Sequence, residues 1–285
     1  MRDPRITEQP NLASQHIDEL DALGIVDLIN DQDRMIAAAV GQERESIARA
    51  LELAEHAFRH GGRLIYVGAG TSGRLGVLDA SEMPPTYGTD PSMVRGVIAG
   101  GYEALVRAQE GAEDHPEDGA KAIDELGVGE RDFVLGIATS GTTPYVHGAV
   151  DQARALGASV GFLMCTPPPP ELVERLDVVI APLVGAEVIT GSTRMKAGTA
   201  TKLVLNTITT GAMVFDGCSH GCVEDMRRKG LRLSFNSDAG GGPADIDFFN
   251  ENLAEDVCDK QPYSARPVLN RVKPNAPMAP VPLCS

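Results

Sequence analysis

The residues best suited to do chemistry lie within residues 64–88. A short apolar run there ends in a glycine-rich turn that holds Thr71, Ser72 and Gly73, and Glu82 follows on the next helical stretch. Backbone N–H groups at the start of a helix, together with small hydroxyl groups, are the donors that a phosphate needs. A carboxylate held in place can donate or accept a proton. The stretch therefore predicts a phosphate cradle and a proton-transfer group in one strand–turn–helix unit.

Two further turns combine hydroxyl groups with glycine in the same way. One follows an apolar run and the other precedes a helical pattern. Together they carry Ser140, Gly141, Thr142, Thr143, Ser192 and Thr193. Because ligands of open α/β sheets bind at the carboxyl ends of the strands, the three turns are expected to line one pocket for a sugar phosphate. The alternative is that these residues are ordinary helix N-caps, which serine and threonine favour in any protein.

A dinucleotide-binding fold is the rival interpretation of the first turn. Gly68, Gly70 and Gly73 match the spacing G-x-G-x-x-G after a strand, but that pattern alone is weak. A dinucleotide fold also needs an acidic residue at the end of the next strand to hold a ribose. The expected strand Val94–Ala99 is followed instead by two glycines. The repeated hydroxyl turns therefore favour a monophosphate ligand.

A second candidate carboxylate is Glu113, which lies in an acidic stretch where local sequence does not distinguish it from its neighbours. Taken separately, Glu82 and Glu113 each fit solvated surface acids. No nucleophile triad and no set of metal ligands accompanies the turns, so proton transfer beside the aldehyde of an open-chain sugar phosphate is the expected chemistry. Such chemistry suits an isomerase or, with a leaving group one carbon further on, an eliminating enzyme. The spacing does not decide between them.

Short apolar runs alternate with helical patterns from residue 64 onward. The expected strands are Leu64–Val67, Val94–Ala99, Phe133–Ala138, Ser159–Met164 and Val178–Ala181. Helices are expected over Tyr145–Leu156 and Ala200–Val214. Continuous apolar strands between helices predict a parallel sheet covered on both faces. Residues 21–60 have a helical period and follow a polar, extended arm over residues 1–20. The prolines after Met83 predict that the helix behind the first turn ends there.

Composition narrows the classes of function. The net charge of −15 argues against nucleic-acid binding, which needs clustered lysine and arginine. No apolar run is long enough to span a membrane and the first residues lack an apolar signal region, so a cytoplasmic protein is expected. The five cysteines are irregularly spaced, which suits reduced thiols. Cys218, His220 and Cys222 lack a second ligand pair at suitable spacing, so no metal is expected.

Five segments carry a specific resemblance to a known family. They are Gly68–Gly76, Asp79–Gly88, Glu110–Asp114, Ser140–Tyr145 and Thr190–Thr199. They resemble the N-acetylmuramic acid 6-phosphate etherases, which belong to the sugar isomerase (SIS) fold group. The resemblance runs from about residue 4 to about residue 214. Related phosphosugar isomerases share the hydroxyl turns but lack the Ser-Glu-x-Pro-Pro segment.

The resemblance implies an activity and a site. The reaction would cleave the D-lactyl ether of N-acetylmuramic acid 6-phosphate to N-acetylglucosamine 6-phosphate and D-lactate, by elimination and then hydration, without a metal or organic cofactor. Glu82 matches the family's proton donor to the departing lactate, and Glu113 matches its second active-site glutamate. The expected assembly is a homodimer with sites built across the subunit interface. Two alternatives stay open: a phosphosugar-binding regulator without catalysis, and an aldose–ketose isomerase of the same fold.

The resemblance also implies an architecture. The expected fold is an α/β, SIS-type three-layer sandwich, in which helices flank a central parallel sheet and an N-terminal helical segment precedes it. The expected domains are an arm and helices over residues 1–54 and an SIS phosphosugar-binding domain over residues 55–215. From residue 216 to residue 285 the sequence departs from the family's helical C-terminal region. A divergent, poorly ordered tail is expected there.

Overall fold

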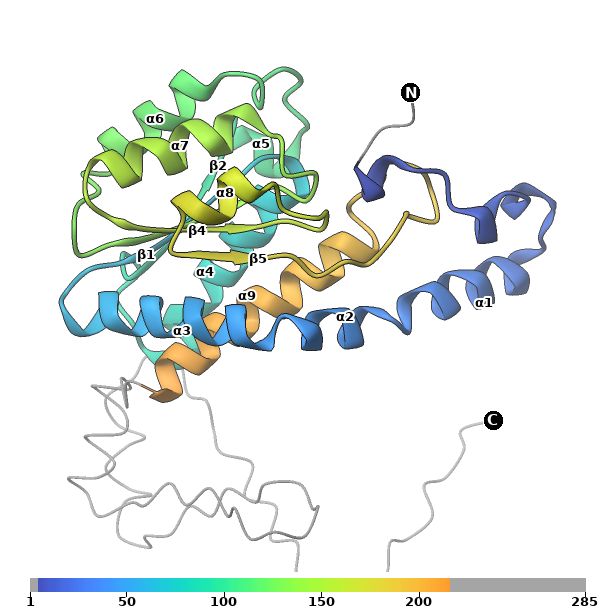
Figure 1. The fold of residues 1–285 in the computed structure, drawn as a ribbon, viewed down its shortest axis with the longest axis horizontal. Coiled ribbons are helices and arrows are strands. Elements are labelled where there is room, and N and C mark those ends of the chain that lie inside the picture. The colour runs from blue at the N-terminus through green and yellow to red at the C-terminus, as the bar shows by residue number, and fades with distance from the viewer. Residues whose placement is uncertain (1–4, 216–285) are drawn as a thin grey trace, which may run out of the picture. The chain divides into compact units, whose positions relative to one another are not determined.

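Five short strands form one parallel sheet in the part of the chain that the computed structural model describes, residues 5–215 (Figure 1). The strands are β1 (Leu64–Gly68), β2 (Val94–Ile98), β3 (Phe133–Ile137), β4 (Ser159–Leu163) and β5 (Val178–Ile180). Their order across the sheet is β2-β1-β3-β4-β5. Each strand lies where its apolar run predicts it, and the parallel sheet is confirmed.

Helices cover both faces of the sheet, because the apolar strands present side chains to each side in alternation. Leu64 and Tyr66 pack in one core cluster with α3 (Arg44–Arg59), α4 (Gly70–Tyr87) and α9 (Lys196–Phe215). Ile65 and Val67 pack in a second cluster with α6 (Pro116–Glu125), α7 (Pro144–Ala155) and α8 (Pro170–Arg175). Figure 1 shows α6 and α7 on one side of the strands and α3 and α9 on the other. The expected three-layer sandwich is confirmed.

The N-terminal arm, residues 5–20, is not simply extended as expected. It contains three single turns of 3₁₀-helix: η1 (Ile6–Glu8), η2 (Leu12–Ser14) and η3 (Ile17–Glu19). The Asn11 side chain caps η2 by accepting a hydrogen bond from the Ala13 N–H, 3.0 Å away. Such local hydrogen bonds bend the backbone where sequence composition alone predicts an extended chain.

A helical segment follows the arm, as predicted, and consists of α1 (Ala22–Asp33), α2 (Ile36–Gln42) and α3. α1 contributes no buried residue, whereas α3 buries six. The domain boundary expected between residues 54 and 55 stays a prediction. α3 runs across that position without a break. The expected tail and the Cys218–Cys222 pair lie outside the described residues.

The helix behind the first turn is longer than predicted. α4 contains Pro84 and Pro85, so the expectation that it ends at Met83 is wrong. Met83 is 3% exposed in the core cluster of α3, α4 and α9, and this burial outweighs the tendency of a residue before proline toward extended backbone. The helix ends instead at Gly88, whose φ of 67° forms a left-handed C-cap.

α4 approaches the sheet closely at glycine positions. A Cβ atom at Gly68 would lie 2.6 Å from the Gly73 nitrogen, and one at Gly73 would lie 2.6 Å from Ile98 Cγ1. One at Gly76 would lie 2.8 Å from Tyr66 Cβ. These distances are too short for a side chain, so glycine is needed wherever the helix crosses the strands. Close packing therefore accounts for Gly68 and Gly73 of the G-x-G-x-x-G spacing without a dinucleotide, and the φ of 53° accounts for Gly70.

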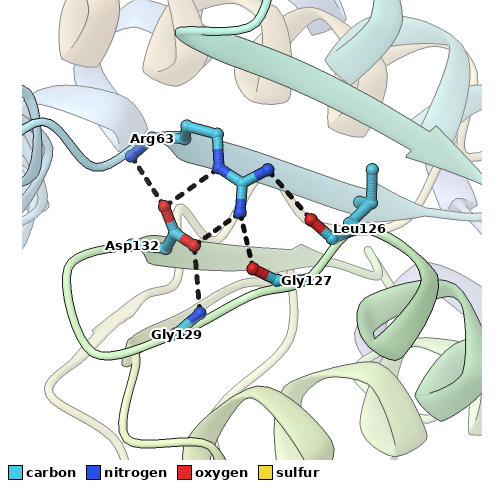
Figure 2. Close-up of polar contacts among 5 residues, drawn as sticks. All are labelled: Arg63, Leu126, Gly127, Gly129 and Asp132. Atoms are coloured by element: carbon cyan, nitrogen blue, oxygen red, sulfur yellow. Dashed lines mark hydrogen bonds and ion pairs between the residues drawn. The ribbon is translucent and has the colours of Figure 1, made fainter.

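A partly buried ion pair joins β1 and β3 at the ends remote from the hydroxyl turns (Figure 2). The Arg63 guanidinium donates from Nη2 to Asp132 Oδ2 at 2.7 Å and from Nε to Asp132 Oδ1 at 3.1 Å. It also donates to the carbonyls of Leu126 and Gly127. Burial alone would raise the pKa of Asp132, but hydrogen bonds from Arg63 and Gly129, with the Arg63 charge, hold that pKa below its ordinary value.

We expect Gly73→Ala to lower the free energy of unfolding by about 1–3 kcal/mol, because the added methyl group overpacks the contact with Ile98. Gly41→Ala is the matched control, since a Cβ atom at Gly41 meets nothing within 4 Å. That change should stabilise the helix by up to about 1 kcal/mol. Urea denaturation measures both, and equal midpoints for the two variants would contradict the packing argument.

We expect Asp132→Asn to lower the free energy of unfolding by roughly 2–4 kcal/mol at pH 7, because Arg63 keeps its position but loses its charged partner. The folded pKa of Asp132 lies below its unfolded value of about 3.9. The stabilisation is therefore present above that pH and is lost as the pH falls through the folded pKa. Urea titrations from pH 7 to about pH 2 should show the two proteins converging at the acidic end, and a constant difference would refute this origin.

Candidate active site

The sheet order places the first two hydroxyl turns side by side. β1 connects to β2 on one side, and the chain then crosses back to β3 on the other side of β1. Ligands of open α/β sheets bind where the strand order reverses in this way, outside the carboxyl ends of the strands. Gly68 at the end of β1 pairs with Ile137 at the end of β3. The turns at residues 71–73 and 140–143 therefore lie at neighbouring strand ends.

The first turn is the N-terminal turn of α4. Ala69 is the N-cap and has no side chain that could cap the helix, and the Gly73 N–H makes a first intrahelical bond of 3.3 Å to the Ala69 carbonyl. The N–H groups of Gly70, Thr71 and Ser72 precede that bond and point out of the helix start. Such N–H groups, at the positive pole of the helix dipole, are donors of the kind that suits an anion.

The second turn connects β3 to α7. Gly141 has a φ of 77°, and its N–H donates to the Ala138 carbonyl at 2.8 Å. The hydroxyl oxygens of Ser140 and Thr142 are 3.1 Å apart, and Thr143 is the N-cap of α7. The turn is thus a tight loop with three hydroxyl groups at the start of a second helix. Pro144 at the start of α7 lacks an N–H, and the N–H groups of Tyr145 and Val146 already bond carbonyls of Glu113 and Thr143. This turn therefore offers an anion its hydroxyl groups rather than the N–H groups of a helix start.

The third turn leads into α9, and the start of α9 lies beside the first turn. Gly191 has a φ of 74°, and the Ser192 N–H donates to the Ile189 carbonyl at 2.9 Å. A Cβ atom at Gly198 would lie 3.3 Å from the Thr193 carbonyl oxygen and 3.6 Å from Thr71 Cγ2. The structure therefore brings residues of all three hydroxyl turns to one end of the sheet.

Glu187 fixes the base of the third turn, and sequence reasoning missed it. Its two carboxylate oxygens accept hydrogen bonds from the N–H groups of Lys196 and Ala197, at 3.0 and 2.9 Å. This fully buried carboxylate binds the start of α9, nine residues further along the chain, and so closes the loop between them. Burial raises the pKa of Glu187, against the effect of the two N–H groups and of the Lys196 charge. The only feature of the sequence that points to this role of Glu187 is an acidic residue ahead of a helix start.

Lys196 is a second buried group that sequence reasoning missed. Its ammonium nitrogen donates to Gln32 Oε1 at 3.1 Å, and the side chain is almost fully enclosed. Burial lowers the pKa of Lys196, whereas the charges of Glu187 and Asp33 raise it. The contact ties the start of α9 to the end of α1, so it positions the third turn rather than facing it.

A buried polar cluster holds α4 and α9 together beneath the turns that they carry. The Tyr66 hydroxyl donates to Asp79 Oδ2 at 2.9 Å, and the Thr209 hydroxyl donates to Asp79 Oδ1 at 3.4 Å. Burial raises the pKa of Asp79, and the hydrogen bonds from Tyr66 and Thr209 oppose that rise. Because buried polar groups must be paired, these contacts specify how the two helices align.

The two candidate carboxylates differ in where the structure places them. The Glu113 carbonyl accepts a hydrogen bond of 3.0 Å from the Tyr145 N–H, so Glu113 lies beside the second turn with an exposed side chain. Glu82 is also exposed but lies on α4, eleven residues after Thr71. At 1.5 Å per residue, about 16 Å of helix separates them. Within one chain, Glu113 therefore approaches the turns and Glu82 does not.

The described residues contain no group of three or more His, Cys, Asp or Glu side chains arranged to hold a metal ion. Within the same residues, no helix has the length and apolar character needed to cross a membrane. What the site does offer is a set of hydroxyl donors from three turns, the N-terminus of α4 and a nearby carboxylate. Such an arrangement can bind a phosphate and move a proton on the molecule attached to it.

Comparison with solved structures identifies the fold. A phosphoheptose isomerase from Francisella tularensis matches with a TM-score of 0.54 and 19% identity, covering 68% of this chain and 98% of that one. The Vibrio vulnificus NanR protein, complexed with ManNAc-6P, matches with a TM-score of 0.50 and 15% identity, covering 76% of this chain and 72% of that one. At these identities the likeness concerns the fold alone.

Sequence comparison identifies the family. Residues 46–154 match the model of the glucokinase regulatory protein N-terminal SIS domain. An N-acetylmuramic acid 6-phosphate etherase of Rhodopirellula baltica is 56% identical over 215 residues, 75% of this chain and 71% of that protein. One of Photorhabdus laumondii is 52% identical over 212 residues, 74% of this chain and 70% of that protein. The chain therefore belongs to the N-acetylmuramic acid 6-phosphate etherase family.

Proposed function

We propose that this chain cleaves the D-lactyl ether of N-acetylmuramic acid 6-phosphate and releases N-acetylglucosamine 6-phosphate and D-lactate. The observation that carries this proposal is an identity above half, over three quarters of the chain, to proteins named for that activity. The site agrees with it, because three hydroxyl turns and a carboxylate converge at the strand ends where a phosphosugar would bind.

The reaction needs two proton transfers around one carbon–carbon bond. A base removes the proton from C2 of the open-chain sugar, where the neighbouring aldehyde makes it acidic. The electron pair forms a double bond to C3 as the C3–O ether bond breaks. The departing lactate oxygen takes a proton from a general acid, since an alkoxide is a poor leaving group. Water then adds at C3 of the unsaturated aldehyde and restores the hydroxyl group.

Our assignment gives the two glutamates separate parts in this reaction. Glu82 protonates the departing lactate, and Glu113 is the second carboxylate of the site. The phosphate binds at the N–H groups and hydroxyls of residues 71–73, and the turns at residues 140–143 and 192–193 supply further hydroxyls to the substrate. No metal or organic cofactor has a part in the assignment.

We further propose that two copies of the chain share each site. The 16 Å or so of helix between Thr71 and Glu82 exceeds the span from the phosphate to the ether oxygen of one hexose. Glu82 therefore serves a substrate that the turns of the partner copy hold. α1 supports a dimer, because Leu23 and Val26 are 67% and 61% exposed on a helix that has no fully buried residue.

We place the reaction in the cytoplasm, where thiols stay reduced. Cys165 is a free thiol within the described core, and burial raises its pKa to about 12. Such a thiol stays protonated and unreactive at neutral pH. It has a packing role in this proposal and no catalytic one.

Incubation of the purified protein with N-acetylmuramic acid 6-phosphate tests the function. We expect stoichiometric release of D-lactate and N-acetylglucosamine 6-phosphate, and incorporation of solvent ¹⁸O at C3 of the sugar. Isomerised sugar without lactate would indicate an aldose–ketose isomerase. Tight binding with no product would indicate a regulator. Either result would refute the proposed function.

Mixing two inactive variants tests the shared site. Glu82→Gln and Glu113→Gln should each lose activity by roughly 100-fold or more, the usual effect of removing a proton-transfer group. If each site takes one glutamate from each copy, refolding the two variants together should restore about a quarter of the wild-type activity, because half of the dimers then hold one intact site. Each variant refolded alone is the control. Mixed dimers without recovery would contradict a site shared between copies.

A further inference from the structure

One turn of the N-terminal arm reaches two of the hydroxyl turns. The Arg5 guanidinium donates from Nη1 to Thr142 Oγ1 in the second turn, at 3.4 Å. A Cβ atom at Gly191 in the third turn would lie 3.1 Å from Glu8 Oε2. Arg5 is the N-cap of η1, a single turn of helix, and Glu8 is the last residue of that turn. This part of the arm therefore brings one cation and one anion to the pocket from far along the sequence.

Contacts outside the three hydroxyl turns hold the arm in this place. The Ser14 hydroxyl donates to the Val188 carbonyl at 2.6 Å, and Asn11 Nδ2 donates to the Ala186 carbonyl at 3.1 Å. Thr7, between the two charged residues, is fully buried. Because Thr7 is buried before Glu8 and the Asn11 and Ser14 side chains are bonded after it, the arm around Glu8 is positioned in advance of any ligand.

Arg5 brings a positive charge to the second turn and Glu8 brings a negative charge to the third, so the two sides of the pocket differ in charge. The proposed substrate carries a phosphate and a lactyl carboxylate, and the chain's net charge of −15 disfavours anions in general. A local cation is therefore valuable, and Arg5 supplies one beside the Thr142 hydroxyl. Glu8 disfavours a phosphate at the third turn for the same electrostatic reason.

We propose that Arg5 is a substrate-binding residue that pairs with the phosphate at the second turn, and that Glu8 keeps the phosphate away from the third turn. The proposal rests on the proposed function for the class of substrate, a sugar phosphate. In this arrangement the phosphate lies between the first and second turns, and the sugar faces the third. The guanidinium is suited to the task, since its planar set of N–H donors matches phosphate oxygens.

Steady-state kinetics of Arg5→Gln test this role. We expect KM for N-acetylmuramic acid 6-phosphate to rise roughly 10- to 100-fold, the range for losing a charge-assisted hydrogen bond, with kcat changed less than about threefold. Arg44→Gln is the matched control, because it removes the same charge from an exposed position on α3. It should leave both constants unchanged, and Arg5→Lys should recover part of the affinity. An unchanged KM in Arg5→Gln would overturn the proposal.

Direct binding separates this inference from the proposed function. Calorimetric titration with N-acetylglucosamine 6-phosphate and with inorganic phosphate needs no catalysis. Weaker binding by Arg5→Gln would support the role of Arg5 even if the wild type released no lactate, and equal binding would refute it. A wild type that binds neither ligand would refute both proposals.

Removing Glu8 should change phosphate affinity in the opposite direction to removing Arg5. Glu8→Gln removes a negative charge from the pocket, so it should bind inorganic phosphate several-fold more tightly than the wild type. Ionic strength provides a second readout, because salt should reduce the difference between variant and wild type. Weaker phosphate binding by Glu8→Gln would mean that the carboxylate supports the phosphate rather than repelling it.

Discussion

The pairing of β1 with β3 is the constraint on which the rest of the structure depends. Leu64 pairs with Phe133 and Gly68 with Ile137, although the strands are separated by a whole strand and three helices in the sequence. At one end the pair is fixed by the Arg63–Asp132 ion pair, and at the other it presents two hydroxyl turns. A shift of one residue would turn the strands' core side chains to the opposite faces and separate the two turns.

Much of the fold could be predicted because the strands are continuous apolar runs between helical patterns. The strand order could not, since each run is equally compatible with a central or a side position. Pro84 and Pro85 illustrate the same limit. Local preference ends the helix before them, whereas the burial of Met83 and the left-handed cap at Gly88 carry it further.

Residues of the candidate site could be proposed from the sequence where the residue type itself indicates a use, but not where only packing brings them into place. Hydroxyl groups beside glycine indicate an anion site, so the three turns could be found by inspection. Glu187 could not, because its hydrogen bonds to the start of α9 exist only once the loop closes. Arg5 is 137 residues from the hydroxyl that it contacts. The separation of Glu82 from Thr71 along α4 likewise follows only when the helix is seen to be continuous.

The anchoring of the arm has a consequence for the order of events during synthesis. Asn11 and Ser14 bind carbonyls 175 and 174 residues later, so their partners do not yet exist when they leave the ribosome. At roughly 5–20 residues per second, the wait lasts on the order of ten seconds or more. The loop that must close is long and entropically unfavourable until β4 and β5 have joined the sheet. An early part of the chain is therefore among the last to find its place.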